Sequence, residues 1–483
     1  MLKVSSNVLK RTYLSGTVRS FSITSTALAK KPAASKPVKK KVTFDPKKFQ
    51  QPQQKVKKSG MTHLEFHDAV KEMNFDKLAM DLTPFELSEL TSAVVSNESG
   101  GQVTAFTSES AAILKTLGSF KKYQHHELFS KPVSMVTHNT ALLNEQFVEK
   151  LADASSRTNR VCLVGERGAG KSTLLAQAQA LALDKYEGDV ILLHIDAAEN
   201  ITDGSSDYIY NSKNKTYHQP MFTKRWIYKL RNSNEAVFKK LKLSRDISFQ
   251  NKRVDHQLKK DENTLYDFLQ LNVDFGKFQP THAFSFFIEE LVHHSKSVPV
   301  LLSVDNANAV LDFPVTKYRH HDFTPVHLNE LEIGDFLLKV AGGEISFEKG
   351  GVLLSKTGLV GDHQKTLSTA LGLVEYDPYA KKQFFDLDIA NTLLAHGGVK
   401  PFTVSNLTKD ETRTLLNFWR ESGVVYVKDY VTKESLKPET EAEKKAPKPE
   451  FDSEAQFENL VNSYYTVSTG NPHYLLKASA ISY

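Results

Sequence analysis

Four short apolar runs divide the middle of the chain, and each of them stops at glycine or at a polar residue. The runs span residues 161–164, 190–195, 298–304 and 351–355, and are followed by Gly165, Asp196, Asp305 and Lys356. Unbroken apolar runs of this length are typical of strands that are buried on both faces of a sheet. Segments with helical periodicity separate the runs, so we predict an α/β fold with a parallel sheet and flanking helices.

Helical patterns and one further strand complete this arrangement. We expect a helix from Asn139, as its cap, to about residue 155, and another from about 171 to 185. Further helices are expected near 264–271, 283–293 and 454–463, a short strand at 402–404, and a last helix after Gly470-Asn471-Pro472. Thr408 and Glu411 have the spacing of a capping box, which predicts that a helix begins there.

The loop after the first apolar run carries the most specific motif of the chain. It reads Gly165, Glu166, Arg167, Gly168, Ala169, Gly170, Lys171, Ser172 and Thr173. This is the complete P-loop pattern G-x-x-x-x-G-K-[ST] between a strand and a helix. Its backbone N–H groups and the helix N-terminus favour phosphate, and Lys171 is expected to reach the β- and γ-phosphates. Arg167 has two open roles, contact with phosphate or with protein, and Glu166 places a carboxylate inside the loop.

The third run adds the second part of a nucleotide site. Asp305 follows a buried strand, as a Walker B acid does, and we expect Ser172 and Asp305 to hold Mg²⁺. Ser355 or Lys356, at the end of the next strand, is expected near the γ-phosphate. Asn306 stands where active enzymes of this kind usually carry a carboxylate, and an amide orients water without accepting its proton. We therefore expect tight nucleotide binding with slow or absent hydrolysis.

Charge is distributed unevenly along the chain. Residues 1–60 hold fifteen Lys and Arg and one acid, Asp45, whereas the whole chain has a net charge of +6. Residues 1–29 contain Lys, Arg, Ser and Thr and no acid, which is the composition of a mitochondrial presequence or, alternatively, of an ordinary disordered tail. Residues 30–60 are rich in Lys, Pro and Gln, and are predicted to form a disordered basic arm that binds RNA phosphates or serves as a solvated linker.

These features predict the following domain organisation. Residues 61–130 form an N-terminal subdomain, 131–400 the P-loop core, and 401–483 a C-terminal helical lid with a disordered loop at 434–454. The core contains a basic insertion at about 204–262, in which Trp226, Tyr228 and Phe238 stand among Lys and Arg. Such a segment suits an RNA-facing surface, because cations bind phosphate and aromatic rings stack on bases. A solvated helix that buries Trp226 in the core explains it equally well.

Other classes of site are disfavoured. The single cysteine, Cys162, excludes an internal disulfide framework and a Cys-rich zinc site, and its place in the P-loop strand predicts a small buried residue. No apolar run approaches the ~20 residues of a membrane helix, so we expect no membrane span. Three histidine pairs begin at His125, His293 and His320, and lack metal-ligand spacing, so we expect them to be polar surface residues.

The order of P-loop, insertion, Walker B strand, polar-ended strand and helical module resembles an AAA+/STAND-type NTPase core. Together with the presequence and the Lys-rich arm, the chain resembles the P-loop proteins of the mitochondrial small ribosomal subunit, the death-associated protein three family. The resemblance covers about residues 130–480. The segments that carry it are VGERGAGKSTLL, LLSVDNANAV, FTVSNLTKDE and TGNPHYLL.

This resemblance implies a location and a ligand. Members of the family lie in the head of the small subunit within the mitochondrial matrix, contact ribosomal RNA and neighbouring proteins, and approach the large subunit as a possible bridge. It also implies bound GTP or GDP and a structural or regulatory role in mitochondrial translation. The residues alone favour adenine, by analogy with AAA+ folds, and the guanine-reading motif Asn-Lys-x-Asp is absent. We follow the family and expect GTP or GDP, with ATP as the alternative.

Two other functions compete with that of a ribosomal component. The first is a soluble matrix AAA+ ATPase that remodels other proteins, which needs an arginine finger, and only Arg413 and Arg420 are candidates. The second is a signalling switch whose partner binding depends on nucleotide. Asn306 and the basic arm favour the ribosomal reading over the ATPase.

Overall fold

The computed structural model describes residues 86–95, 101–129, 131–212, 214–250, 255–271, 282–312, 315–358, 365–379, 381, 384–425 and 453–479. All of them belong to the compact unit His67–Tyr483. The predicted presequence, the basic arm and nearly all of the predicted loop 434–454 lie outside the described residues. No helix in the described part of the chain is long and apolar enough to cross a membrane.

A five-stranded sheet forms the centre of the P-loop core. Its strands follow the order β13–β3–β12–β9–β4, and every neighbouring pair is parallel. The bounds are Arg160–Val164 for β3, Ile191–Ile195 for β4, Val300–Val304 for β9, Gly350–Ser355 for β12 and Lys400–Thr403 for β13. The four strands predicted from the apolar runs and the fifth at 402–404 are confirmed, and so is the α/β class.

The register of the sheet brings the ends of the central strands to one edge. Leu354 of β12 pairs with Cys162 of β3 on one side and with Val304 of β9 on the other. Because all strands are parallel, the polar residues that follow them emerge together at the carboxyl edge. The sheet topology therefore creates a shared site from segments that are far apart in sequence.

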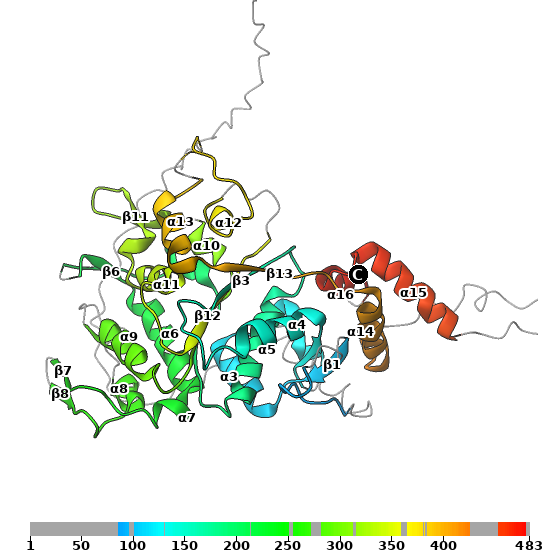
Figure 1. Ribbon diagram of the computed structural model, residues 1–483, viewed down its shortest axis with the longest axis horizontal. Coiled ribbons are helices and arrows are strands. Elements are labelled where there is room, and N and C mark those ends of the chain that lie inside the picture. Colours follow the sequence, from blue (N-terminus) through cyan, green and yellow to red (C-terminus); the bar gives the residue numbers. More distant parts are fainter. Residues whose placement is uncertain are drawn as a thin grey trace, which may run out of the picture. The chain divides into compact units, whose positions relative to one another are not determined.

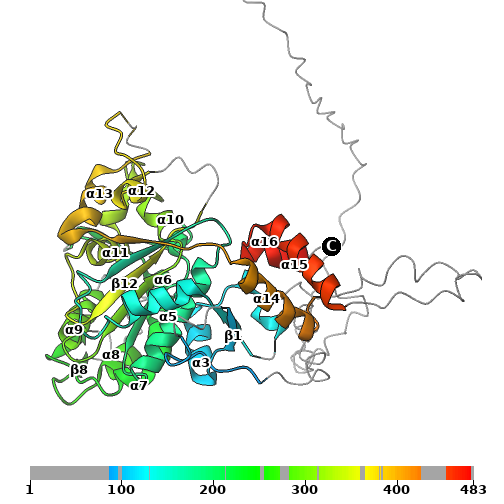
Figure 2. The ribbon, with the colours of Figure 1, turned by 45° about the vertical axis from the view of Figure 1, so that its right-hand side comes forward.

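Helices cover both faces of this sheet (Figures 1 and 2). Helix α5 (Lys171–Lys185) connects β3 to β4, and α11 (Glu332–Gly342) lies between β9 and β12 along the chain. These two connections run in opposite directions across the sheet, and right-handed crossovers then place α5 and α11 on opposite faces.

Smaller elements surround the core. The other helices are α3 (Ser108–Leu117), α4 (His138–Leu143), α6 (Pro220–Ser233), α7 (Glu235–Phe238), α8 (Leu265–Leu271), α9 (Ala283–His294), α10 (Asn308–Leu311), α12 (Thr366–Ala370), α13 (Leu387–Leu394), α14 (Lys409–Glu421), α15 (Ser453–Ser468) and α16 (Pro472–Ser479). The other strands form antiparallel pairs: β1 (Gln102–Ala105) with β2 (Val133–Val136), β5 (Ile209–Asn211) with β6 (Thr216–His218), β7 (Ile247–Gln250) with β8 (Asp255–Leu258), and β10 (Val315–Arg319) with β11 (Pro325–His327).

Two buried clusters hold these elements together. The larger cluster contains the sheet and its flanking helices, and Phe106, Leu114 and Leu117 from the segment before the P-loop core join it. The smaller cluster contains α14, α15 and α16 together with Val103 of β1. Residues 101–129 therefore contribute apolar side chains to both clusters.

The helix predicted from Asn139 is interrupted. An α-helical stretch, α4, gives way to a π-helical turn at Asn144–Val148. The N-cap is Thr137, whose N–H donates to Thr140 Oγ1 at 3.1 Å. Asn139 does not cap the helix, because its amide nitrogen donates to the carbonyl of Ser405 at 3.1 Å. The Asn139 side chain, which the local pattern predicted to be the cap, thus makes a long-range hydrogen bond instead.

The remaining helix predictions are largely confirmed. Helices α5, α8 and α9 lie where periodicity placed them, and α15 runs to Ser468, beyond the predicted residue 463. The capping box forms as expected, because Thr408 N–H donates to Glu411 Oε2 at 2.7 Å and Glu411 N–H to Thr408 Oγ1 at 3.3 Å. Trp226 is buried and its Nε1–H donates to His194 O at 2.8 Å, so the core interpretation of that residue holds.

Candidate functional site

The P-loop joins β3 to α5 as a tight turn at the carboxyl edge of the sheet. Lys171 is 6% exposed, and its ammonium donates to the carbonyls of Gly165 at 2.8 Å and Glu166 at 2.5 Å. Burial lowers the pKa of Lys171 from its usual value, and the nearby Asp305 carboxylate opposes this shift. The loop carbonyls therefore hold the Lys171 ammonium beside the N-terminus of α5. The N–H groups of this helix end favour an anion such as phosphate.

Ser172 and Asp305 meet at this edge, as predicted. Ser172 Oγ donates to the Asp305 carboxylate at 3.0 and 3.2 Å, although the two residues are 133 positions apart. A hydroxyl and a carboxylate so close together match the oxygen donors that Mg²⁺ takes beside nucleotide phosphates. Ser172 and Asp305 thus supply donors of the type that the expected metal takes.

Asn306 adopts a left-handed backbone conformation with φ 57°, and both ends of its amide are engaged. Its Nδ2 donates to Glu199 Oε2 at 2.8 Å, and its Oδ1 accepts from Thr357 Oγ1 at 2.7 Å. Glu199 and Asn306 line one cavity at this edge of the sheet, although Glu199 follows a different strand, β4. A carboxylate therefore lies beside Asn306. The sequence around Asp305 does not indicate it, because Glu199 is 107 positions away from Asn306 along the chain.

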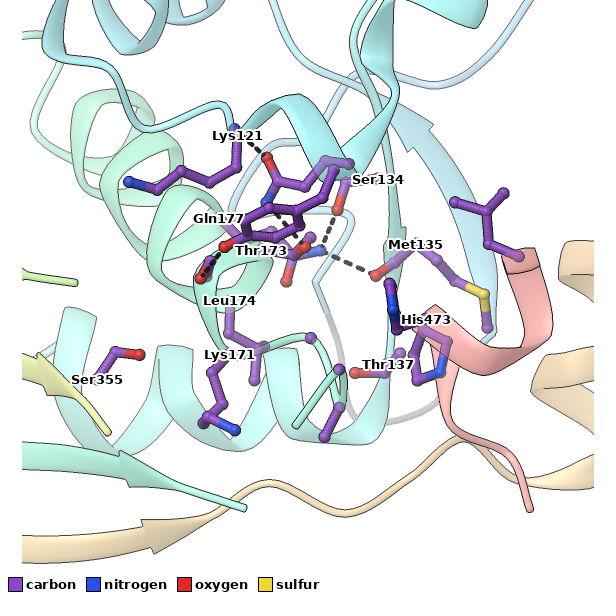
Figure 3. Close-up of a pocket in the computed structure, with 18 of the residues that line it drawn as sticks. Lys121, Ser134, Met135, Thr137, Lys171, Thr173, Leu174, Gln177, Ser355 and His473 are labelled. Carbon is purple, nitrogen blue, oxygen red and sulfur yellow. Dashed lines mark hydrogen bonds between the residues drawn. The ribbon is translucent and has the colours of Figure 1, made fainter. Parts of the chain in front are cut away.

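The two residues that we predicted near the γ-phosphate, Ser355 and Lys356 at the end of β12, have different surroundings. Ser355 is 2% exposed and lines the cavity at the carboxyl end of its strand (Figure 3). Lys356 does not line it, because its ammonium contacts Ser368 Oγ and lies 3.9 Å from the Asp312 carboxylate. Of the two, Ser355 is the residue that lines the cavity.

Three side chains from the segment before the P-loop core also reach the site. Tyr123 Oη lies 3.0 Å from Ser172 Oγ, and Gln124 Nε2 donates to Thr173 Oγ1 at 3.1 Å. Lys121 Nζ lies 3.4 Å from the Asp305 carboxylate. Figure 3 shows Lys121 and Thr173 beside the first turn of α5. No motif or periodicity in the sequence marks these three residues.

The C-terminal helical module lies directly on the P-loop. Asn471 Nδ2 donates to the carbonyl of Arg167 at 2.9 Å, and His473 N–H donates to that of Gly168 at 3.3 Å. Burial lowers the pKa of His473, and the positive charge of Arg167 lowers it further. In this module Arg413 pairs with Glu458 on the neighbouring helix α15 at 2.5 Å.

A cavity of about 590 Å³ connects these groups. Its polar end contains P-loop residues 167–173, with Asp305, Asn306 and Glu199. Its apolar end is lined by Val103, Phe129, Met135, Leu415, Phe418 and Trp419. A polar end for phosphates joined to an apolar end for a planar ring is the arrangement that a nucleotide requires, and the volume lies within the range of ligand pockets.

The structure thus brings most of the predicted site residues to one cavity. Arg167, Gly168, Ala169, Gly170, Lys171, Ser172, Thr173, Asp305 and Asn306 all line it. Gly165 and Glu166 do not; their carbonyls hold Lys171, and the Glu166 carboxylate accepts from Asn406 Nδ2 at 3.3 Å. Cys162 is fully buried in β3, and burial raises the pKa of its thiol to about 12, as expected of a small core residue.

A solved structure matches part of this chain with a low score. It is the crystal structure of Cdc6p from Pyrobaculum aerophilum, which has 13% sequence identity and a TM-score of 0.26. The match covers 64% of this chain and 53% of that one.

Comparison of sequences identifies two curated relatives and a family. The small ribosomal subunit protein mS29 of Neurospora crassa is 22% identical over 361 residues, which cover 67% of this chain and 68% of that protein. The protein of the same name from Schizosaccharomyces pombe is 24% identical over 337 residues, which cover 68% of this chain and 66% of that protein. The family model described as mitochondrial ribosomal death-associated protein 3 matches residues 134–478. This match spans most of the chain, which therefore belongs to the mitochondrial ribosomal death-associated protein 3 family.

Proposed function

We propose that this chain is a nucleotide-binding structural component of the small subunit of the mitochondrial ribosome, where it supports mitochondrial translation. The observation that carries the nucleotide part is the junction of Lys171, Ser172 and Asp305 at one end of a cavity of about 590 Å³. Membership of a mitochondrial ribosomal family supports the ribosomal part and the location in the matrix.

The bound molecule is a nucleoside di- or triphosphate with Mg²⁺. Its phosphates lie over the N-terminus of α5, where Lys171 and the loop N–H groups neutralise them. Ser172 and Asp305 would hold Mg²⁺, which would add positive charge beside the phosphates. The base occupies the apolar end of the cavity, against Met135, Phe418 and other side chains there. We assign GTP or GDP on the family resemblance, with ATP as the alternative, and identification by mass of the nucleotide released on denaturation distinguishes them.

Hydrolysis is slow or absent in this proposal. The residue after Asp305 is an amide, Asn306, which does not accept a proton from water, and its two polar atoms are engaged by Glu199 and Thr357. A general base needs a free lone pair directed at the attacking water. Steady GTP turnover above about one per second, an ordinary enzyme rate, contradicts this part of the proposal.

The central test is the substitution Lys171→Ala in the full chain. Loss of a buried cation that faces two or three phosphate charges is expected to weaken GDP binding by at least about 100-fold, as measured by titration calorimetry. Lys185→Ala, at the exposed end of the same helix, is the matched control and is expected to bind as the wild type does. Equal affinity of all three proteins for GDP contradicts nucleotide binding at this loop.

The ribosomal part is tested by sedimentation of a mitochondrial lysate. We expect the chain to migrate with small subunits, and the Lys171→Ala chain to show whether assembly needs the nucleotide. Migration as a discrete hexamer free of RNA supports a matrix remodelling ATPase instead.

A further inference from the structure

The segment that carries Lys121 is fastened to the P-loop helix at three points. Ser119 Oγ donates to Gln179 Oε1 at 2.6 Å in the middle of α5. Tyr123 Oη and Gln124 Nε2 bond Ser172 and Thr173 in its first turn, at 3.0 and 3.1 Å. These contacts join two parts of the chain that are 49 to 60 residues apart. The segment therefore has one defined position over the start of α5.

Lys121 is fixed within this segment. Its own backbone N–H donates to Gln124 Oε1 at 2.7 Å, so the side chain that binds Thr173 also holds the Lys121 backbone. The dashed line at Lys121 in Figure 3 marks the bond that its backbone N–H donates. The adjacent Phe120 packs edge-on against Phe106, with ring centroids 5.2 Å apart, which anchors the other side of the turn in the core.

This anchoring directs the Lys121 side chain into the nucleotide cavity. The side chain is 17% exposed, its ammonium donates to the carbonyl of Asp196, and it lies 3.4 Å from the Asp305 carboxylate. The Asp305 carboxylate is thus shared between the Ser172 hydroxyl and a lysine. An ammonium at this distance in a partly desolvated site neutralises much of the carboxylate charge that attracts a divalent cation.

We propose that Lys121 is a resident cation of the nucleotide site, which supplies beside Asp305 the positive charge that Mg²⁺ supplies in other P-loop proteins and so makes binding of a nucleoside diphosphate nearly independent of Mg²⁺. The inference rests on the proposed nucleotide binding. Lys121 acts on the phosphates by charge from its fixed place, and Lys171 contacts them from the loop. A site with two fixed lysines retains its ligand when free Mg²⁺ falls, which suits a nucleotide held as a structural element.

The test compares GDP affinity in millimolar Mg²⁺ and after chelation with EDTA, in the full chain. The wild type is expected to lose less than about threefold in affinity on chelation. Lys121→Met, which keeps the length of the side chain and removes its charge, is expected to lose more than about tenfold under the same change. Lys121→Arg retains the charge and is expected to behave as the wild type does.

Lys122→Met is the matched control, because Lys122 is the exposed neighbour on the same turn and does not line the cavity. Thermal unfolding without nucleotide confirms that each variant is folded. A wild type that loses tenfold or more on chelation, equally with both methionine variants, overturns the inference while leaving nucleotide binding intact. Absence of GDP binding by the wild type in Mg²⁺ overturns the proposed function itself.

Discussion

At the scale of single residues, a buried polar network connects the sheet to the segment over the P-loop. His194 of β4 is 1% exposed, and its Nδ1 lies 3.0 Å from Ser303 Oγ on β9. Gln179 Nε2 donates to the same Ser303 hydroxyl at 2.7 Å, and Gln179 Oε1 accepts from Ser119. Burial, assisted by the charge of Lys121, lowers the pKa of His194 to about 4. This histidine is therefore neutral in the folded protein at neutral pH.

The low pKa of His194 predicts acid sensitivity. An unfolded histidine titrates near ~6.5, so between that pH and about 4 the unfolded state binds more protons than the folded one. The free energy of unfolding is expected to fall with pH across this window, by up to about 3 kcal/mol from this residue. Denaturant unfolding at several pH values measures it. His194→Gln removes the titration, and a pH dependence that is unchanged in this variant contradicts the assignment.

At the scale of elements, the contact between the P-loop and the C-terminal helices depends on a glycine. Gly168 has φ 87°, and a Cβ there lies 2.5 Å from His473 Cβ and 2.7 Å from Asn471 Oδ1. Any side chain at this position pushes the start of α16 away from the loop. The third glycine of the motif, Gly170, has a similar φ but no atom near its Cβ position. Position 168 is thus restricted to glycine both by its backbone conformation and by the neighbouring atoms of α16 and Asn471.

Gly168→Ala is expected to loosen the C-terminal helices. The positive φ alone costs an alanine about 1 kcal/mol, and displacement of α16 adds to it. Hydrogen exchange is expected to accelerate in α15 and α16, and GDP affinity to fall. Gly188→Ala is the control, because Gly188 has φ 79° and no atom within 4 Å of its Cβ position. Equal exchange in the C-terminal helices of both variants argues against a tight contact.

At the scale of the whole molecule, positive charge is concentrated in residues 1–60, which carry +14, against +6 for the whole chain, and leave residues 61–483 at −8. Besides the N-terminal 60 residues, the exposed side of α6 presents Lys224, Arg225 and Arg231, and Arg231 stacks over Tyr228 with 5.3 Å to the ring centroid. In the described part of the chain no carboxylate pairs with Lys224 or Arg225. Tyr228 is 59% exposed, so cations and an aromatic ring share one surface, which suits ribosomal RNA.

Charge reversal on this surface tests the RNA contact. Lys224→Glu with Arg225→Glu is expected to release the chain from small subunits at lower salt than the wild type, because each lost phosphate contact weakens binding. The slope of binding against salt is expected to fall by about one unit for each lost contact. Sedimentation at increasing salt gives the release point. Lys185→Glu with Lys409→Glu changes net charge equally at exposed sites on other helices. Identical release of the two double variants contradicts an RNA-facing α6.

The strands and the glycine-rich motif of the loop were predictable, because both depend on the types of neighbouring residues along the chain. The four apolar runs form β3, β4, β9 and β12, and the glycines and Lys171 of the loop lie within residues 165–171. Burial periodicity and a contiguous motif are both encoded within a few neighbouring residues. Asp305 was found in the same way, from the end of an apolar run, although its contact with Ser172 spans 133 positions.

The sequence by itself therefore determined the strands, the glycine-rich loop at 165–172 and the acid that follows β9. Only the tertiary structure decided that Lys121 and Tyr123 lie over the loop, that Glu199 meets Asn306, and that Asn471 reaches Arg167 across 304 positions. Lys121, Tyr123 and Glu199 have no local signature, because each is placed by the packing of a whole element against α5 or the sheet. Contacts between elements depend on how the whole chain folds, whereas helices, strands and turns depend on residues that are neighbours in the sequence.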